Sequence, residues 1–179
     1  ASKVLAPASH LGRRLLFLSK PARSQSQIHI GAPGVAVMDP DYASLQLANH
    51  VFGGGSFSAR LMSEVREKRG WSYGAYSSFR SGKQPLYFLM HTIPSNKDSA
   101  PAVKLMLEMY SDFKRNGISP SEYEFAKRSL VNQSAFMQDT MRKRLDNKMS
   151  ELILGLLFEA GGIAYTCACT KRDPQKDQY

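Results

Sequence analysis

Apolar positions along the chain change between strand-like and helical spacing, and the order of the two patterns predicts a mixed fold. Two short segments near the N-terminus, residues 13–19 and 27–30, are expected to be strands separated by a turn at Pro21. Strand character returns at residues 72–79 and 86–93, which a Ser-Gly-Lys-Gln turn joins. These four segments predict a small, largely antiparallel sheet.

Helical spacing with start and stop signals separates and follows these strands. The first helix is expected to begin at Asp39, an N-cap acid followed by proline, and to stop at the glycines of residues 53–55. The second is expected to be capped by Ser56 and to end at Gly70. Further helices are expected at residues 96–117, 119–137 and 140–154. The order of elements predicts an α+β fold, with helices packed on one face of the sheet.

Two local patterns strengthen the C-terminal helices. Residues 119–122 read Ser-Pro-Ser-Glu, a capping box with proline in the first turn. The face around Met106 is rich in methionine, a side chain that fills gaps between helices and sheets, and is expected in the core. A length of 179 residues suits a single domain covering residues 1–179.

Charge and cysteine usage add little to this picture. The net charge of +9 admits a nucleic-acid or anionic-membrane partner, but the densest basic run, residues 142–144, lies beside Asp139 and Asp146 and reads as a solvated helix face. No apolar stretch is long enough to span a membrane. Cys167 and Cys169 are too few and too close to each other for a zinc site, and are expected to be free thiols.

The most informative stretch is residues 38–76, MDPDYASLQLANHVFGGGSFSARLMSEVREKRGWSYGAY. With the later Gly-Ile-Ser-Pro-Ser-Glu helix start, it resembles the inactive domain of the insulinase-like (M16) zinc peptidases, a group that includes mitochondrial processing peptidase. The resemblance covers residues 15–155 and implies the LuxS/MPP-like metallohydrolase fold. Residues 158–179 depart from the family's ending and are expected to be a divergent or truncated tail.

The resemblance also implies where the metal lies. The active half of such peptidases holds zinc with an inverted His-x-x-Glu-His motif and a distal glutamate. The four histidines of this chain are His10, His29, His50 and His91, and no two stand within one helical turn. A zinc site open to water needs at least three converging ligands. The chain is therefore expected to bind no metal and to hydrolyse no peptide on its own, while zinc is expected in an active partner domain, on the same polypeptide or a separate subunit.

Two residues are implied to contact the substrate. The family places an arginine and a tyrosine, seven residues apart, opposite the zinc, and these map to Arg66 and Tyr73. A guanidinium and a hydroxyl aimed at the scissile carbonyl oxygen would stabilise the charge that builds there. Arg69 fits less well because its spacing to Tyr73 is four. Without the resemblance, Arg66 would read as a charge favourable at a helix C-terminus, and Tyr73 as strand packing.

The glycines Gly53, Gly54 and Gly55 have two readings. They end a helix, and they resemble a glycine-rich loop near the substrate in the family, where glycine lets a bound chain approach closely.

Three functions follow from these observations. The leading one is the non-catalytic, substrate-contacting half of a zinc metalloendopeptidase, with a peptide substrate and a zinc-bearing partner. The second is a non-proteolytic scaffold or core subunit of the same fold. The third, a basic nucleic-acid binder, has no recognition motif in its favour, and no nucleic-acid partner is expected. The compartment stays open, with bacterial periplasm and cytoplasm as the expectations.

Overall fold

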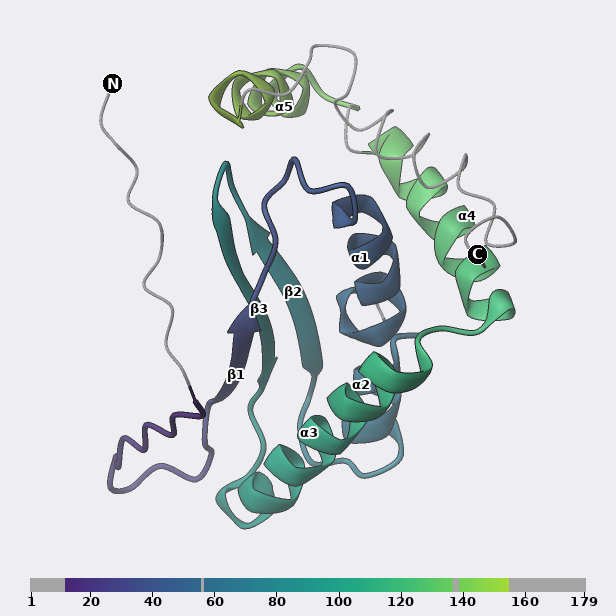
Figure 1. The fold of residues 1–179 in the computed structure, drawn as a ribbon. Coiled ribbons are helices and arrows are strands. Elements are labelled where there is room, and N and C mark those ends of the chain that lie inside the picture. The colour runs from purple at the N-terminus through teal and green to yellow at the C-terminus, as the bar shows by residue number, and fades with distance from the viewer. Residues whose placement is uncertain (1–11, 56, 137–138, 155–179) are drawn as a thin grey trace.

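In the described part of the chain, three antiparallel strands form a sheet, and the third strand in the sequence lies between the other two. The computed structural model describes residues 12–55, 57–136 and 139–154. The strands β1 (Ile28–Pro33), β2 (Ala75–Ser81) and β3 (Pro85–Thr92) lie in the order β1-β3-β2 (Figure 1). His91 of β3 pairs with His29 of β1 on one side and with Tyr76 of β2 on the other.

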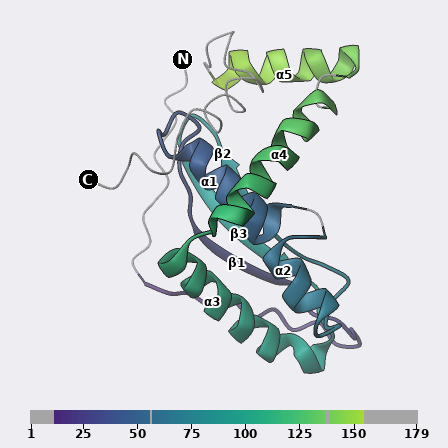
Figure 2. The ribbon, with the colours of Figure 1, turned by 90° about the vertical axis from the view of Figure 1, so that its right-hand side faces the viewer.

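The helices that contact the sheet lie on one of its faces, so the predicted α+β architecture is confirmed (Figures 1 and 2). In chain order they are α1 (Tyr42–Asn49), the π-helical turn η1 (His50–Gly54), α2 (Arg60–Met62), a second π-helical turn η2 (Ser63–Glu67), the 3₁₀ turn η3 (Asn96–Asp98), α3 (Ser99–Asn116), α4 (Pro120–Phe136) and α5 (Met141–Leu154). Figure 2 shows α1 and α2 in front of the sheet, with α4 crossing α1.

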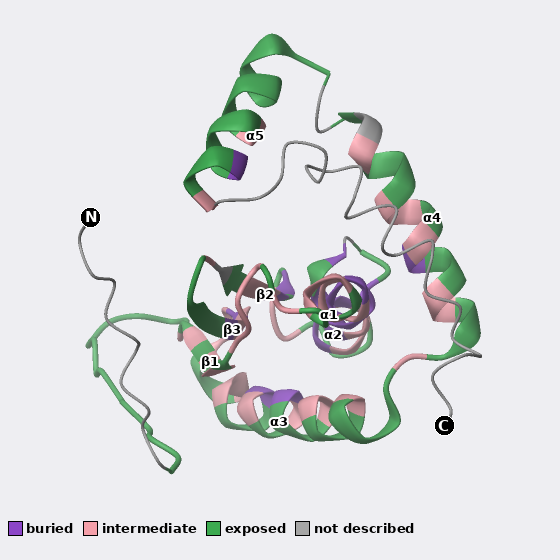
Figure 3. Cartoon of the chain, turned by 45° about the horizontal axis from the view of Figure 1, so that its top comes forward, coloured by how far each residue is buried: buried purple, intermediate pink, exposed green. Residues whose placement is uncertain are grey.

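The core is built between this face and the helices. Side chains of β2, β3, η1, α2, η2 and α3 are almost fully buried there: Phe52, Leu61, Val65, Ala75, Phe88, Met90 and Met106. The expectation for Met106 is confirmed, since none of its surface is exposed. Figure 3 shows the buried stripe of α3 turned toward the sheet and the exposed surface of α5. Aromatic rings complete the packing, and Phe52 stacks on Phe113 with 4.6 Å between the ring centroids.

A second, smaller cluster attaches α4 to α1. Leu47 and Val51 pack against Ala126 of α4. The predicted capping box fixes the start of α4, because the backbone N–H of Ser119 donates to the Glu122 carboxylate at 2.7 Å and the backbone N–H of Glu122 donates to the Ser119 hydroxyl at 3.3 Å. The same carboxylate accepts two hydrogen bonds from Arg60, at 2.7 and 2.6 Å, so it joins α4 to α2.

The Arg60–Glu122 pair makes the fold sensitive to acid. Hydrogen bonds from Arg60 hold the pKa of Glu122 at about 2, against an ordinary value of 4.5. A lowered pKa stabilises the fold above the ordinary value, and this contribution is lost as pH falls from about 4.5 toward about 2. Since both side chains are about 30% exposed, solvent screening reduces the effect, and we expect Glu122→Gln to lower the free energy of unfolding by about 1 kcal/mol at neutral pH.

Urea unfolding of both proteins across this pH range measures the difference. We expect the curves of wild type and Glu122→Gln to converge near pH 2. Glu124→Gln, two residues further along α4, is the control and should run parallel to wild type throughout. A constant gap between wild type and Glu122→Gln would contradict an ionic contribution.

One predicted strand is wrong. Residues 13–19 form no strand, and residues 15–18 are 72–93% exposed. This run is continuously apolar rather than alternating, so a strand made from it would need cover on both faces. No described element supplies that cover.

Three boundaries also differ from expectation. The first helix begins at Tyr42, because Asp39 instead accepts a hydrogen bond from the backbone N–H of Asp41 in a turn. The second helix begins at Arg60 with Ala59 as its N-cap. The expected cap, Ser56, lies outside the described residues. Tyr73 precedes β2 rather than entering it. The predicted tail at residues 158–179 also falls outside the described part.

None of the helices in the described part of the chain has the length and apolarity needed to cross a bilayer.

Candidate functional site

The two predicted contact residues come from adjacent segments that a tight turn joins. Arg66 lies in the π-helical turn η2, whose wider helical turn is a local distortion often found at functional sites. Gly70 follows with φ of +62°, a conformation that favours glycine, and its backbone N–H donates to the carbonyl of Arg66 at 3.0 Å. The Ser72 hydroxyl then donates to the carbonyl of Gly74 at 3.0 Å and accepts from the backbone N–H of Ile93, on the segment after β3. These hydrogen bonds therefore fix the position of Tyr73 in the turn between η2 and β2.

The structure brings the side chains of Arg66 and Tyr73 together. The guanidinium carbon of Arg66 lies 4.9 Å from the centre of the Tyr73 ring, within cation–π distance. A second ring, that of Phe57, has its centre 4.7 Å from the same carbon. Tyr73 is 81% exposed and Phe57 is 59% exposed. We call these three residues the arginine cage; its aromatic rings face solvent rather than the core.

Two neighbouring arginines form hydrogen bonds and ion pairs with carboxylates, whereas Arg66 forms none within the described part of the chain. Arg60 is paired with Glu122. Arg69 donates to both the carboxylate and the backbone carbonyl of Glu64, and lies over Trp71. Among the residues that the structure describes, the Arg66 guanidinium has ring contacts but no hydrogen bond or ion pair. Its N–H donors are therefore available to a ligand.

Sequence reasoning predicted contact roles for Arg66 and Tyr73 and did not single out Phe57, which the structure places against Arg66. The signal that was available is the Ser-Phe-Ser segment directly after the glycines, where a large apolar residue stands in a turn. Such a residue has no place in the predicted core, and an exposed aromatic side chain in a loop is a reason to look for a binding role.

The glycines of residues 53–55 are held in close internal contacts. A Cβ atom on Gly53 would lie 2.5 Å from the Ser77 hydroxyl and 2.8 Å from its backbone nitrogen. On Gly54 it would meet the Asn49 amide, and on Gly55 it would lie 2.5 Å from the carbonyl of His50. Gly53 and Gly55 are buried, while Gly54 is exposed. Packing of η1 against β2 thus leaves no room for a side chain on Gly53, and contacts within the helical segment crowd Gly54 and Gly55.

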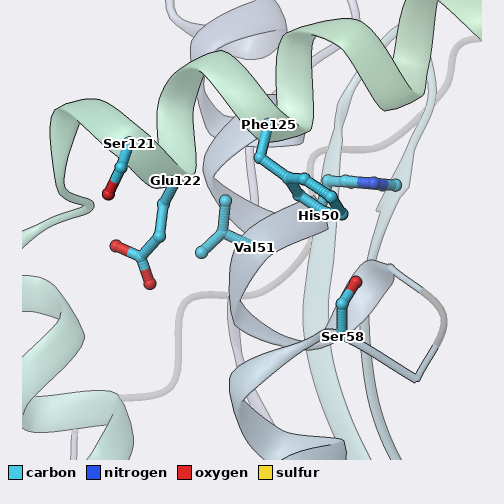
Figure 4. Close-up of a pocket in the computed structure, with 6 residues that line it drawn as sticks. All are labelled: His50, Val51, Ser58, Ser121, Glu122 and Phe125. Carbon is cyan, nitrogen blue, oxygen red and sulfur yellow. The ribbon is translucent and has the colours of Figure 1, made fainter.

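A separate cavity of about 290 Å³ lies between η1 and the start of α4 (Figure 4). Six residues line it: His50, Val51, Ser58, Ser121, Glu122 and Phe125. His50 shares a 3.1 Å hydrogen bond with the Ser129 hydroxyl, and burial lowers the pKa of its imidazole. Neither Arg66 nor Tyr73 lines this cavity, and its one carboxylate is already bound by Arg60.

The described residues do not fit a zinc ion. Within that part of the chain, no three His, Cys, Asp or Glu side chains gather closely enough to hold a metal. The rings of His29 and His91 lie tilted against each other with 4.6 Å between their centroids, but no third ligand from the described residues joins them. Zinc requires three or four protein ligands, which the described residues do not bring together.

Comparison with known proteins extends the picture. A family model described as the peptidase M16 inactive domain matches residues 2–130. A relative from Bacillus subtilis, described as the uncharacterized zinc protease YmxG, is 27% identical over 137 residues, which are 76% of this chain and 33% of that protein. A relative from Helicobacter pylori, described as the non-peptidase homolog YmxG, is 25% identical over 133 residues, 74% of this chain and 31% of that protein. The chain thus spans about a third of the length of these curated relatives.

Solved structures share the fold. The peptidase M16 inactive domain from Pseudomonas fluorescens superposes with a TM-score of 0.75 at 28% identity, covering 86% of this chain and 36% of that one. An inactive peptidase domain from Bordetella parapertussis gives a TM-score of 0.68 at 13% identity, covering 86% of this chain and 83% of that one. At that identity the second likeness is one of fold alone.

Proposed function

This chain belongs to the peptidase M16 inactive-domain family, and from that premise we propose that it is the substrate-contacting half of a zinc metalloendopeptidase. In this proposal it is a single domain over residues 1–179 that completes the peptide-binding chamber of a zinc-bearing M16 partner domain, on the same polypeptide or a separate subunit. The zinc and the water it activates belong to that partner. This chain supplies binding and charge stabilisation.

The observation that supports the proposal most is the state of Arg66. Its donors have no partner among the described side chains, and the Tyr73 ring lies 4.9 Å away in an exposed position. A guanidinium and a phenol side by side are hydrogen-bond donors of the kind that stabilise the negative oxygen formed when a peptide carbonyl is attacked. Because the pair is prearranged by a turn, little reorganisation is needed at the moment of reaction.

We propose in addition that the glycine segment, residues 53–55, is a substrate loop. Gly54 is the exposed member of the three, so it is the position at which an extended peptide would approach the backbone of η1. Gly53 and Gly55 would act through the shape of the turn.

Reconstitution tests the proposal. The chain, the zinc-bearing M16 domain encoded with it, and their mixture are each assayed with a fluorogenic peptide library. We expect no hydrolysis by this chain, little by the zinc-bearing domain, and a rate at least tenfold higher for the mixture, because the donors of Arg66 and Tyr73 are then opposite the metal. A stable complex with no gain in rate would contradict a role in substrate contact.

That outcome would favour the second candidate, a non-proteolytic scaffold of the same fold. The observation on its side is the Helicobacter pylori relative, which is described as a non-peptidase homolog and is 25% identical over 133 residues. A scaffold would associate with its partner through the same fold, and substitutions at Arg66 and Tyr73 would leave that association unchanged.

A further inference from the structure

Phe57 is a second aromatic ring in contact with the Arg66 guanidinium, beside that of Tyr73. The two ring centres lie 4.7 Å and 4.9 Å from the guanidinium carbon, at nearly equal distances. Both are close enough for the cation–π attraction between a guanidinium and an aromatic ring. Phe57 and Tyr73 come from different turns, one before α2 and one after η2, so helix geometry alone does not impose this arrangement.

Two residues with extended backbone conformation flank Phe57 and place it beside Arg66. Gly55, with ψ of 178°, leads the chain out of η1, and Ala59, with ψ of 144°, leads it into α2. Phe57 lies in the turn between them and remains 59% exposed. An exposed phenylalanine in a turn contributes little to the core, so its contact with Arg66 is the notable interaction that it makes.

Contact with two rings restricts how the guanidinium can present its donors. The faces of a guanidinium accept no hydrogen bonds, and all five N–H groups point outward in its plane. Contact with two rings limits the rotation of the guanidinium, so fewer orientations of its N–H donors remain accessible. Arginine has substantial rotamer entropy, and fixing its plane before the ligand arrives lowers the cost of binding.

We propose that Phe57 is a positioning residue, which holds the Arg66 guanidinium in the plane from which its N–H groups reach the substrate carbonyl. This inference rests on the proposed function. Phe57 acts through Arg66 and contacts neither the reacting atoms nor the metal. Its effect is therefore on the transition state more than on substrate affinity.

Two measurements separate this role from a merely structural one. In the full chain alone, the Arg66 Nε–Hε resonance reports the cage directly, and we expect Phe57→Ala to shift it and to sharpen it, because a ring-current source and a restraint are removed. In the reconstituted peptidase we expect Phe57→Ala to lower kcat about three- to tenfold with KM within twofold. Phe57→Tyr, which keeps the ring, should restore kcat, while Phe57→Leu should not.

Phe125→Ala is the matched control, since Phe125 is a similarly exposed phenylalanine (50%) that lines the His50 cavity. It should change neither the Arg66 resonance nor kcat. If Phe57→Ala shifts the resonance and leaves kcat unchanged while Arg66→Ala inactivates the enzyme, the positioning role is refuted and the proposed function stands. A raised KM with unchanged kcat would also refute it, as Phe57 would then bind substrate directly. If Arg66→Ala itself is silent, the proposed function fails and this inference with it.

Discussion

Arg66→Ala in the reconstituted peptidase is expected to lower kcat by about 10²–10³-fold, the loss typical of one donor to a developing oxyanion. The side chain has ring contacts and no described hydrogen-bond or ion-pair partner, so its removal should leave the folded chain almost as stable as before. Arg66→Lys should recover little of the rate, because an ammonium lacks the planar fork that the two rings fit. Steady-state kinetics on a peptide substrate and thermal unfolding of the same preparations measure both effects.

Tyr73→Phe provides the complementary test, since it keeps the ring beside Arg66 and removes the hydroxyl alone. We expect a loss in kcat of similar order. Arg69→Gln is the matched control, an arginine three residues away whose donors are already bound by Glu64. It should keep its rate. Rates within twofold of wild type for both Arg66→Ala and Tyr73→Phe would contradict the assigned roles.

Local signals in the sequence predicted the parts of the fold that depend on local chemistry. The capping box at Ser119 and Glu122 forms its reciprocal hydrogen bonds, since both partners lie within one helical turn. The Met106 face is buried, as both the helical spacing of its apolar residues and their type predict. The proximity of Arg66 and Tyr73 was predicted from resemblance rather than from physics. Their spacing brings them together only because the turn at Gly70 reverses the chain.

Features that depend on packing between distant segments could not be predicted from the sequence. The π-helical turns at His50–Gly54 and Ser63–Glu67 insert extra residues into helices whose apolar spacing predicts regular turns. The Phe57 contact requires the positions of two separate turns. The segment at residues 13–19 has strand composition, but composition cannot supply a neighbouring strand.

The glycines of residues 53–55 show how one pattern can carry two roles. Asn49 and Ser77 exchange hydrogen bonds beside them. The Ser77 hydroxyl donates to the side-chain Oδ1 of Asn49 at 2.6 Å, and the side-chain Nδ2 of Asn49 donates to the Ser77 backbone carbonyl at 3.3 Å. This buried pair joins α1 to β2 at a distance that leaves no room for a side chain on Gly53. A structural requirement of this kind acts on stability, whereas a substrate loop acts on kinetics, so the two roles can be measured separately.

Gly53→Ala is expected to lower the free energy of unfolding by about 3 kcal/mol, the upper range for overpacking a tight core. The new methyl group would lie 2.6 Å from Leu61 Cδ1 and 2.8 Å from the backbone nitrogen of Ser77, and backbone of the sheet cannot move aside as a flexible side chain can. In a chain of this size the melting temperature should fall by roughly 10 °C. Urea and thermal unfolding of the chain alone give both values.

Gly31→Ala is the control that separates this clash from a general cost of replacing glycine. Gly31 lies in β1, where a Cβ atom would make only an ordinary contact at 3.7 Å with the carbonyl of Phe88. Alanine is at least as compatible with a strand as glycine. The free energy of unfolding of Gly31→Ala should therefore stay within about 0.5 kcal/mol of wild type. If Gly53→Ala were equally harmless, the close packing of η1 on β2 would be wrong. Close approach of a peptide substrate would then be the remaining explanation for glycine at this position.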